Sequence, residues 1–380
     1  MSKKIYLDNA ATSFPKPKCV AEAMVDYMTN NGASLHRGDY GSVFEVENAA
    51  LTLREQLCEL FNHDEIKNVV INAGATMGMN TVLIGSLNEG DHVLVSSMEH
   101  NAVMRPLHEL ECRGVSFDHI PCDSQGRLDP NKIPQLIKPN TKMLVLCHAS
   151  NVCGTLQNAA AVGQVCKEHN LLYVLDGAQT AGHVNIDFAK WNLDALVLPA
   201  HKGLMGPSGI GALLLSRRLA DAIRPLITGG TGSRSDDEHQ PWLMPDKLES
   251  GTLNMPGIYG FSAALGYIHS VGVDALFERE RLLTARFLSG VASLRNVKLY
   301  GIPNLIDRVG VIALDFIGTD NALAASRLEQ KGIMTRCGLH CAPLAHKTLG
   351  SFPRGLVRFS IGAFTTEADI DAALGAIEQI

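Results

Sequence analysis

The sequence lacks the charge patterns of proteins that bind nucleic acid or anionic membranes. It has no basic run, and its 33 Lys and Arg residues against 39 Asp and Glu residues give a net charge of −6. Nucleic acid and membrane surfaces are therefore not expected partners. No window reaches the roughly 18 consecutive apolar residues that a membrane span needs, and no apolar stretch of signal-peptide length follows the N-terminal lysines. We therefore expect a cytoplasmic protein.

The nine cysteines lack the spacing of a disulfide or zinc framework. They are spread thinly along the chain, no C-x-x-C occurs, and several lie inside apolar runs, where a reduced thiol packs as a small hydrophobic group. Only Cys337 and Cys341 lie close together, and His340 beside them has no second ligand pair elsewhere. We expect no metal site.

Alternation of apolar runs with helical segments predicts the fold class. At 380 residues, with 46% hydrophobic and 19% charged residues, the chain is expected to form two soluble domains. Apolar spacing of three and four residues predicts a scaffold helix over 44–61. The alternation predicts a mostly parallel sheet with helices on both faces. Its strands are expected at 69–72, 92–97, 142–151, 171–175, 195–198 and 209–216.

After about Pro256 the pattern changes to that of an α+β domain. Helices are expected at 260–270, 275–293 and 321–331, with short strands near 297–301 and 310–316. We therefore predict a large α/β domain over residues 15–255. A smaller α+β domain would combine residues 1–14 with 256–380.

A carboxylate and an amine follow two apolar runs within residues 171–211. Asp176 ends the first run, and Lys202 follows the second. In open α/β sheets the carboxyl ends of strands form the ligand crevice, so both groups could share one site. Pyridoxal phosphate (PLP) chemistry uses such a pair: the lysine amine binds a carbonyl carbon, and the carboxylate lies beside a pyridine nitrogen. The alternative is a helix cap and a solvated cation.

Other predicted strands also end in polar groups that suit a planar, phosphorylated ring. Gly74-Ala75-Thr76 lies where a strand gives way to a helix, and helix N-termini bind phosphate. His100, Asn151 and Gln179 follow three further strands. In the second domain, Cys341 lies in an expected loop with Arg336 nearby, which favours a thiolate. Arg358 on a short strand would suit a carboxylate.

Ten short motifs follow one another along the chain: YLDNAAT (6–12), LHRG (35–38), GATMGMN (74–80), MEHNA (98–102), SNVCGT (150–155), DGAQ (176–179), HKGLMGPSGIG (201–211), ESGTLN (249–254), RCGLHC (336–341) and VRFS (357–360). In these motifs the chain resembles the cysteine desulfurases and selenocysteine lyases of the class V aminotransferase group, and its RCGLHC motif resembles that of the group II enzymes. The resemblance implies the PLP-dependent transferase fold type I, with a mostly parallel central sheet, and PLP as cofactor.

The resemblance also implies a role for each candidate site residue. Lys202 would hold the cofactor aldehyde, Asp176 would pair with the pyridine nitrogen, and Cys341 would accept sulfur. The ring and phosphate would be bound by His100, Asn151, Gln179, Ala75, Thr76 and His201, with Thr252 from the partner subunit of a homodimer. The substrate would be bound by Arg358, with Asn9 and Arg37 shaping the same end of the site.

Two positions depart from the family pattern. The family commonly has Ser-Gly before His-Lys, whereas this chain has Pro199-Ala200, which removes a hydroxyl and should weaken phosphate binding unless Thr76 or another group compensates. The second position of R-x-G-x-HC is often threonine, but here it is Cys337. That thiol could resolve a persulfide on Cys341 or could replace threonine in packing.

The implied reaction converts L-cysteine to L-alanine and leaves the sulfur on Cys341 as a persulfide. A selenocysteine lyase acting on L-selenocysteine would use the same residues, and an aminotransferase of this fold would not need Cys341. A binding protein that has lost catalysis is a further alternative, against which the intact Lys202, Asp176, His100 and Cys341 argue. The sequence does not identify the sulfur acceptor.

Overall fold

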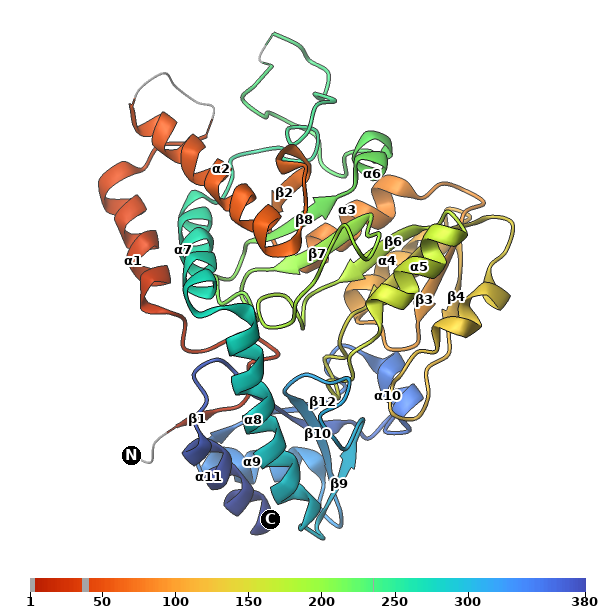
Figure 1. The fold of residues 1–380 in the computed structure, drawn as a ribbon, viewed down its shortest axis with the longest axis vertical. Helices are drawn as coiled ribbons and strands as arrows, with labels where there is room; N and C mark the ends of the chain where they lie inside the picture. The colour runs from red at the N-terminus through yellow and green to blue at the C-terminus, as the bar shows by residue number, and fades with distance from the viewer. Residues whose placement is uncertain (1–3, 36–40, 235) are drawn as a thin grey trace.

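The largest sheet has seven strands and is mostly parallel (Figure 1). The computed structural model describes residues 4–35, 41–234 and 236–380. The strand order is β2-β8-β7-β6-β5-β3-β4, and β8 alone runs antiparallel to its neighbours. The predicted mostly parallel sheet is therefore confirmed. Its strands are β2 (Val69–Asn72), β3 (His92–Ser96), β4 (Ser116–Ile120), β5 (Thr141–Cys147), β6 (Leu172–Asp176), β7 (Ala195–Pro199) and β8 (Gly211–Leu215).

Helices cover both faces of this sheet, which explains why its strands are continuously apolar. In β3, Val93 and Val95 face one hydrophobic cluster while Leu94 faces the other. The first cluster is completed by α3 (Ala75–Ser86), α4 (Asn101–Glu111) and α6 (Arg217–Ala222). The second is completed by α2 (Gly41–Phe61), α5 (Ala159–Glu168) and α7 (Met255–Val271).

A four-stranded antiparallel sheet lies below the large sheet in Figure 1, with the order β12-β13-β10-β9. Its strands are β9 (Val297–Tyr300), β10 (Val311–Phe316), β12 (Arg336–Gly338) and β13 (Leu356–Ser360). Near it, β1 (Ile5–Tyr6) pairs in parallel with β11 (Ile333–Met334), so the start of the chain joins the C-terminal part. The surrounding helices are α8 (Val273–Ala292), α9 (Asn321–Gln330), α10 (Pro343–Leu349) and α11 (Glu367–Glu378).

The remaining elements differ in detail from the sequence-based expectations. Strand β4 was not predicted, because it is an edge strand with polar, partly exposed residues and no apolar run. Helix α2 begins at Gly41, three positions before the predicted start at Phe44. The other elements are α1 (Lys18–Asp26), a π-helical turn (Tyr27–Asn31) and two 3₁₀ turns (Ile66–Asn68 and Pro130–Leu136).

The proposed division at residue 255 falls at the start of a helix that packs on the large sheet. The apolar face of α7, with Ile258 and Phe261, joins the same cluster as the large sheet and α2. The chain then continues through α8 into the smaller sheet. The division into domains therefore stays a prediction, with α7 as the element that connects the two parts.

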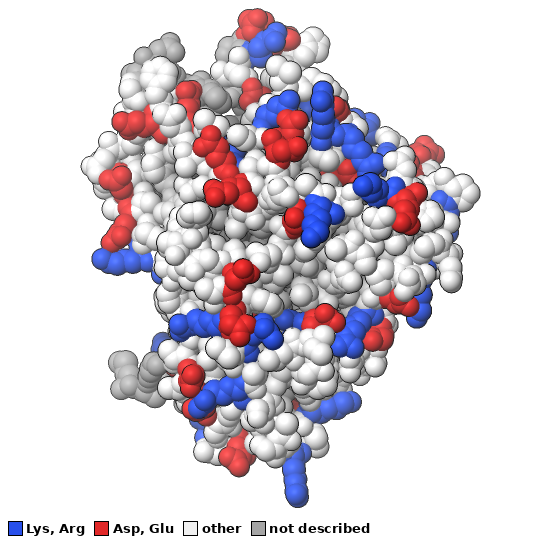
Figure 2. All heavy atoms as spheres, in the orientation of Figure 1, with Lys and Arg blue, Asp and Glu red and all other residues white. Residues whose placement is uncertain are grey.

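The surface carries charges of both signs. On the face shown in Figure 2, acidic and basic side chains are interspersed. Among the described helices, none combines the length and the apolar character needed to cross a bilayer.

A buried ion pair connects α2 to the segment that carries the ESGTLN motif. Arg54 Nη1 and Nη2 donate to the two carboxylate oxygens of Glu249 at 3.0 and 2.8 Å, and their side chains are 8% and 4% exposed. Glu249 also accepts from the Ile71 N–H at 2.6 Å. This carboxylate therefore holds the segment before Thr252 against the start of the large sheet.

Glu249→Gln is expected to destabilise the protein by about 3 kcal/mol, because it leaves the buried Arg54 guanidinium without a compensating charge. Urea unfolding monitored by circular dichroism measures the change. The control is Asp371→Asn, which removes an ion pair with Arg286 in which both side chains are about half exposed. A Glu249→Gln midpoint as close to wild type as that of the control would contradict the assigned contribution.

Candidate active site

A cavity of ≈ 720 Å³ lies at the carboxyl ends of the parallel strands. Nine of the predicted site residues line it, contributed by both parts of the chain. They are Ala75, Thr76, His100, Asn151, Asp176, Gln179, His201, Lys202 and Arg358. Asp176 is the last residue of β6 and follows buried apolar residues of that strand. The structure thus brings together most of the predicted constellation.

Asp176 and Lys202 form the electrostatic centre of this cavity. Burial raises the pKa of Asp176, and the nearby Lys202 amine opposes that rise. Burial likewise lowers the pKa of Lys202, against the opposing effect of Asp176. Asp176 is held in place because its Oδ1 accepts the Ala178 N–H at 2.9 Å. An amine with a lowered pKa is more often deprotonated and can act as nucleophile or base.

The start of α3 forms the wall of the cavity that can bind an anion. The helix begins after Gly74 without a side-chain cap, so its first N–H groups have no partner within the helix. Gly74, Ala75 and Thr76 all line the cavity. The buried His201 Nδ1 has no hydrogen-bond partner in the described part of the chain. Together these donors suit a phosphate group.

His100 is the cap of α4 and is held as a neutral ring. Its Nδ1 accepts the Ala102 N–H at 3.0 Å, so the neutral imidazole carries its proton on Nε2. Burial, followed by the positive charge of Lys202 and Arg336, lowers the pKa of His100 to about 4. A neutral ring at this edge can stack on a heterocycle or donate from Nε2.

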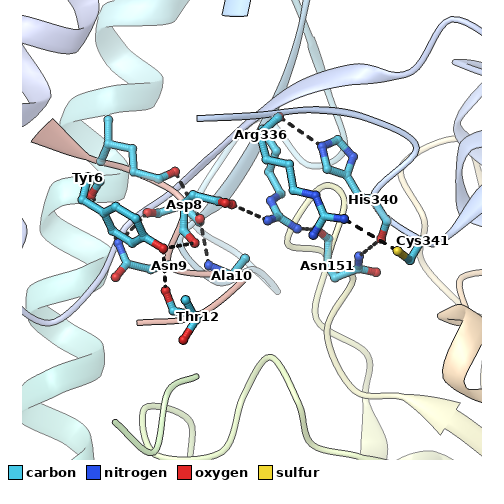
Figure 3. A network of polar contacts seen from close by, with 12 residues as sticks. Tyr6, Asp8, Asn9, Ala10, Thr12, Asn151, Arg336, His340 and Cys341 are labelled. Atoms are coloured by element: carbon cyan, nitrogen blue, oxygen red, sulfur yellow. Dashed lines mark hydrogen bonds and ion pairs between the residues drawn. The ribbon is translucent and has the colours of Figure 1, made fainter. Parts of the chain in front are cut away.

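Asn151 joins the Arg358 side of the cavity to the loop that carries Cys341 (Figure 3). Its backbone carbonyl accepts Arg358 Nη1 at 3.0 Å, and its Nδ2 donates to the His340 carbonyl at 2.7 Å. Arg358 Nη2 pairs with Asp8 Oδ1 at 2.6 Å. Within the described residues, the buried atoms Asn151 Oδ1 and Arg358 Nε have no hydrogen-bond partner. Both atoms belong to side chains that line the cavity.

Cys341 does not line the cavity itself but lies on an exposed turn beside it. Arg336 Nη2 lies 3.6 Å from Cys341 Sγ, and the Cys341 carbonyl accepts the N–H of Asn101 at 2.8 Å. Because Asn101 directly follows His100, the turn is attached at the edge of the cavity. Figure 3 shows Arg336, His340 and Cys341 grouped together on this side of Asn151.

Cys337 lies on the opposite face of its strand. Arg336 lines the cavity, whereas Cys337 packs against the hydrophobic core of the smaller sheet. Successive strand residues point to opposite faces, which explains the separation. Burial raises the pKa of Cys337. These observations support a packing role over the resolution of a persulfide.

Two other predicted site residues, Asn9 and Thr252, do not line the cavity, and a third lies outside the described residues. The Asn9 side chain is bonded to the protein: its Nδ2 donates to the Ser360 carbonyl at 3.0 Å, and its Oδ1 accepts the Phe14 N–H at 3.2 Å. Thr252 is exposed and outside the cavity lining. Arg37 lies outside the described residues.

The cavity also contains Ser208 and Arg336, which were not among the predicted ligands. Ser208 lies in the turn after Pro207 and lines the same cavity as Pro199. Its hydroxyl can donate at this cavity, where the chain lacks the serine of the family pattern. The signal for Ser208 was its place in the glycine-rich turn of the HKGLMGPSGIG motif.

Glu99, directly before His100, is fully buried behind the cavity. Its Oε1 accepts the Ser96 hydroxyl and the Cys147 N–H, and burial raises its pKa from 4.5 to about 8. The Asp176 charge adds to the rise. Burial therefore favours the protonated form of Glu99, which only its three-dimensional surroundings reveal.

These features fit PLP. The cavity offers an uncapped helix N-terminus for a phosphate, a buried carboxylate at Asp176 for a pyridine nitrogen and an amine at Lys202 for an aldehyde. The unpartnered His201 Nδ1 and Asn151 Oδ1 would each gain a polar partner. In the described chain, no group of three or more His, Cys, Asp or Glu side chains is arranged to bind a metal ion.

Proteins named as cysteine desulfurases are similar to this chain in sequence and in structure. A probable cysteine desulfurase from Pyrococcus abyssi is 31% identical over 99% of this chain and 94% of its own length. A cysteine desulfurase from Escherichia coli is 31% identical over 99% of this chain and 93% of its own. The apo structure of a cysteine desulfurase from Thermococcus onnurineus superposes with a TM-score of 0.93, at 29% identity, over 99% of this chain and 94% of that one.

The Escherichia coli cysteine desulfurase CsdA, solved as an S-sulfonic acid form, superposes with a TM-score of 0.89 at 28% identity, over 99% of this chain and 94% of that one. Residues 5–373 match the aminotransferase class-V family. The predicted resemblance and fold are thus confirmed: the chain belongs to the aminotransferase class-V family, among relatives that are cysteine desulfurases.

Proposed function

We propose that this protein is a PLP-dependent cysteine desulfurase that converts L-cysteine to L-alanine and retains the sulfur as a persulfide on Cys341. The observation that carries the proposal is the attachment of the Cys341 turn to the edge of the cavity that contains Lys202 and Asp176. An aminotransferase would need the cavity but not the cysteine. Overall, cysteine and the Cys341 thiol become alanine and a persulfide, so atoms and electrons balance.

Lys202 and Asp176 would perform the proton chemistry at the cofactor. PLP, when bound, supplies an electron sink for the electrons released at the substrate Cα. Asp176, as an anion, would keep the pyridine nitrogen protonated, and Lys202 would remove the Cα proton as a base. The lowered pKa of Lys202 favours its neutral form, which a base requires.

Arg358, His100 and Cys341 would act on the substrate. Arg358 Nε lies buried without a partner among the described residues, and it would donate to the substrate carboxylate. His100 would lie against the cofactor ring, with its Nε2–H available to the reacting groups. The Cys341 thiolate would attack the substrate sulfur, with Arg336 Nη2 3.6 Å from its Sγ.

A homodimer would place Thr252 in the partner's site. In the single chain Thr252 is exposed and outside the cavity, so a phosphate contact requires the partner subunit. The division into a large domain (15–255) and a small domain (1–14 and 256–380) would place the interface of the two parts at the cavity. No observation favours selenium over sulfur as the leaving group.

Lys202→Ala is expected to lower alanine formation by at least ~10³-fold, because it removes both the cofactor anchor and the base. The visible absorbance of the bound cofactor should also shift, as measured by spectrophotometry on purified protein. Lys190→Ala, at an exposed lysine, is the control. Unchanged absorbance and turnover in Lys202→Ala would contradict the assignment.

Cys341→Ala and Cys337→Ala form a matched pair. Cys341→Ala is expected to abolish persulfide formation and lower sulfide release with a reductant by at least ~10²-fold, with unchanged cofactor absorbance. Cys337→Ala should stay within about two-fold of wild type, because that thiol packs away from the cavity. Peptide mass spectrometry after incubation with L-cysteine locates the persulfide. Full sulfide release by Cys341→Ala would show that the persulfide step is wrong.

Glu99→Gln is expected to retain activity, since glutamine mimics the neutral acid. The folded pKa of about 8 lies above the ordinary 4.5, so the stabilising contribution of protonated Glu99 is lost as pH rises through that interval. The stability of wild type should therefore fall relative to Glu99→Gln between about pH 5 and about pH 8. Urea unfolding across this range measures the difference, and parallel pH profiles would refute it.

A further inference from the structure

Two buried histidines and a serine lie behind the Cys341 turn, and the proposed reaction does not use them. His340, His346 and Ser351 are 3%, 0% and 5% exposed. His340 precedes Cys341, His346 lies in α10, and Ser351 follows that helix. The two rings are nearly parallel, with their centroids 5.5 Å apart and an interplanar angle of 19°.

The three side chains form a continuous chain of hydrogen bonds. His340 Nε2 lies 3.2 Å from the Arg336 carbonyl, and His340 Nδ1 lies 3.3 Å from His346 Nε2. His346 Nδ1 lies 2.8 Å from the Ser351 hydroxyl. The chain therefore runs from the backbone of Arg336, across both rings, to the end of α10.

The polarity of each bond follows from the first. A carbonyl only accepts, so His340 Nε2 carries a proton; in the neutral ring, Nδ1 then accepts from His346 Nε2–H. His346 Nδ1 in turn accepts the Ser351 hydroxyl proton. Burial lowers the pKa of His340 to about 3 and that of His346 to about 4, which keeps both rings neutral at pH 7. Every bond in the chain is then satisfied.

The Cys341 turn, which these hydrogen bonds support, has an unfavourable backbone conformation. His340 and Cys341 have φ angles of 49° and 57°, in the left-handed region that residues with side chains seldom occupy. Such conformations persist where the surroundings fix them. Two carbonyl groups of the turn accept hydrogen bonds, that of His340 from Asn151 and that of Cys341 from Asn101. The hydrogen bond between the rings of His340 and His346 is a third contact that holds the turn.

His340 has both ring nitrogens engaged and cannot serve as the base for Cys341. Its Nε2 is committed to Arg336 and its Nδ1 to His346. The same bond to the Arg336 carbonyl fixes the backbone of the residue whose guanidinium lies 3.6 Å from Cys341 Sγ. The chain of bonds thus determines where both the cysteine and its cationic neighbour lie.

We propose that His346 and Ser351 are positioning residues for sulfur transfer, which fix the His340 ring and thereby hold the Cys341 thiol beside Arg336 at the edge of the cavity. Neither residue touches the substrate or lines the cavity. The expected effect on kcat rests on the proposed desulfurase function. The expected effect on the surroundings of the Cys341 thiol does not depend on that function.

The test compares His346→Leu with His346→Gln in the PLP-loaded protein. Leucine fills the buried site but cannot donate, whereas the glutamine amide can replace Nε2–H as the donor to His340. His346→Leu should lower kcat for alanine formation about ten-fold, with the KM for L-cysteine within about two-fold and the cofactor absorbance unchanged. His346→Gln should restore kcat to within about three-fold of wild type.

A second readout does not depend on activity. The rate of Cys341 alkylation by iodoacetamide, followed by peptide mass spectrometry, should fall about three-fold or more in His346→Leu but not in His346→Gln, because the thiol loses its contact with Arg336. The exposed Cys112 serves as an internal control. Ser351→Ala removes only the hydroxyl at the end of the series of hydrogen bonds and should lower the rate of Cys341 alkylation by a smaller factor. This variant tests the proposal if His346→Leu fails to fold.

Equal effects of leucine and glutamine on kcat and on alkylation would assign the site to packing and overturn the proposal. Unchanged kcat and alkylation in His346→Leu and Ser351→Ala would also overturn it. If wild-type protein releases no sulfide from L-cysteine while its Cys341 alkylation still depends on His346, the proposed function fails and the positioning role stands.

Discussion

The burial of two opposite charges at one edge of the large sheet is the constraint on which the site depends. Asp176 and Lys202 each shift toward neutrality when buried, and each opposes the shift of the other. A buried charge needs a partner, so this cavity favours ligands that bring complementary charge. Burial also raises the pKa of Glu99 behind the cavity, and the Asp176 charge adds to that rise. The surrounding strands supply the low-dielectric wall that makes these interactions strong.

The smaller sheet completes the site through a few polar contacts. Arg358 on β13 reaches the Asn151 carbonyl and Asp8, so three distant segments of the chain converge at this side of the cavity. The N-terminal arm also bonds to the turn that follows β7, since the Ser13 N–H donates to the His201 carbonyl next to Lys202.

The sequence predicted what depends on local pattern and missed what depends on distant contacts. Strands buried on both faces are continuous apolar runs, so β6 and its terminal Asp176 could be located from the sequence. Strand β4 is polar and partly exposed, and it is recognisable only through its pairing with β3. The left-handed turn at Cys341 depends on bonds to residues far away in the sequence. No spacing rule predicts the hydrogen bond between His340 and His346.

The replacement of Ser-Gly by Pro199-Ala200 has a structural explanation. Pro199 pairs with Gly211 at the end of β7, and Ala200 is fully buried with its N–H donated to the Ile210 carbonyl. The pair therefore maintains the strand end that positions His201 and Lys202, although it supplies no side-chain donor. An anion in this cavity would depend on the uncapped start of α3, on Thr76 and on His201. Because main-chain N–H groups do most of the binding at a helix N-terminus, loss of one hydroxyl removes one donor among several.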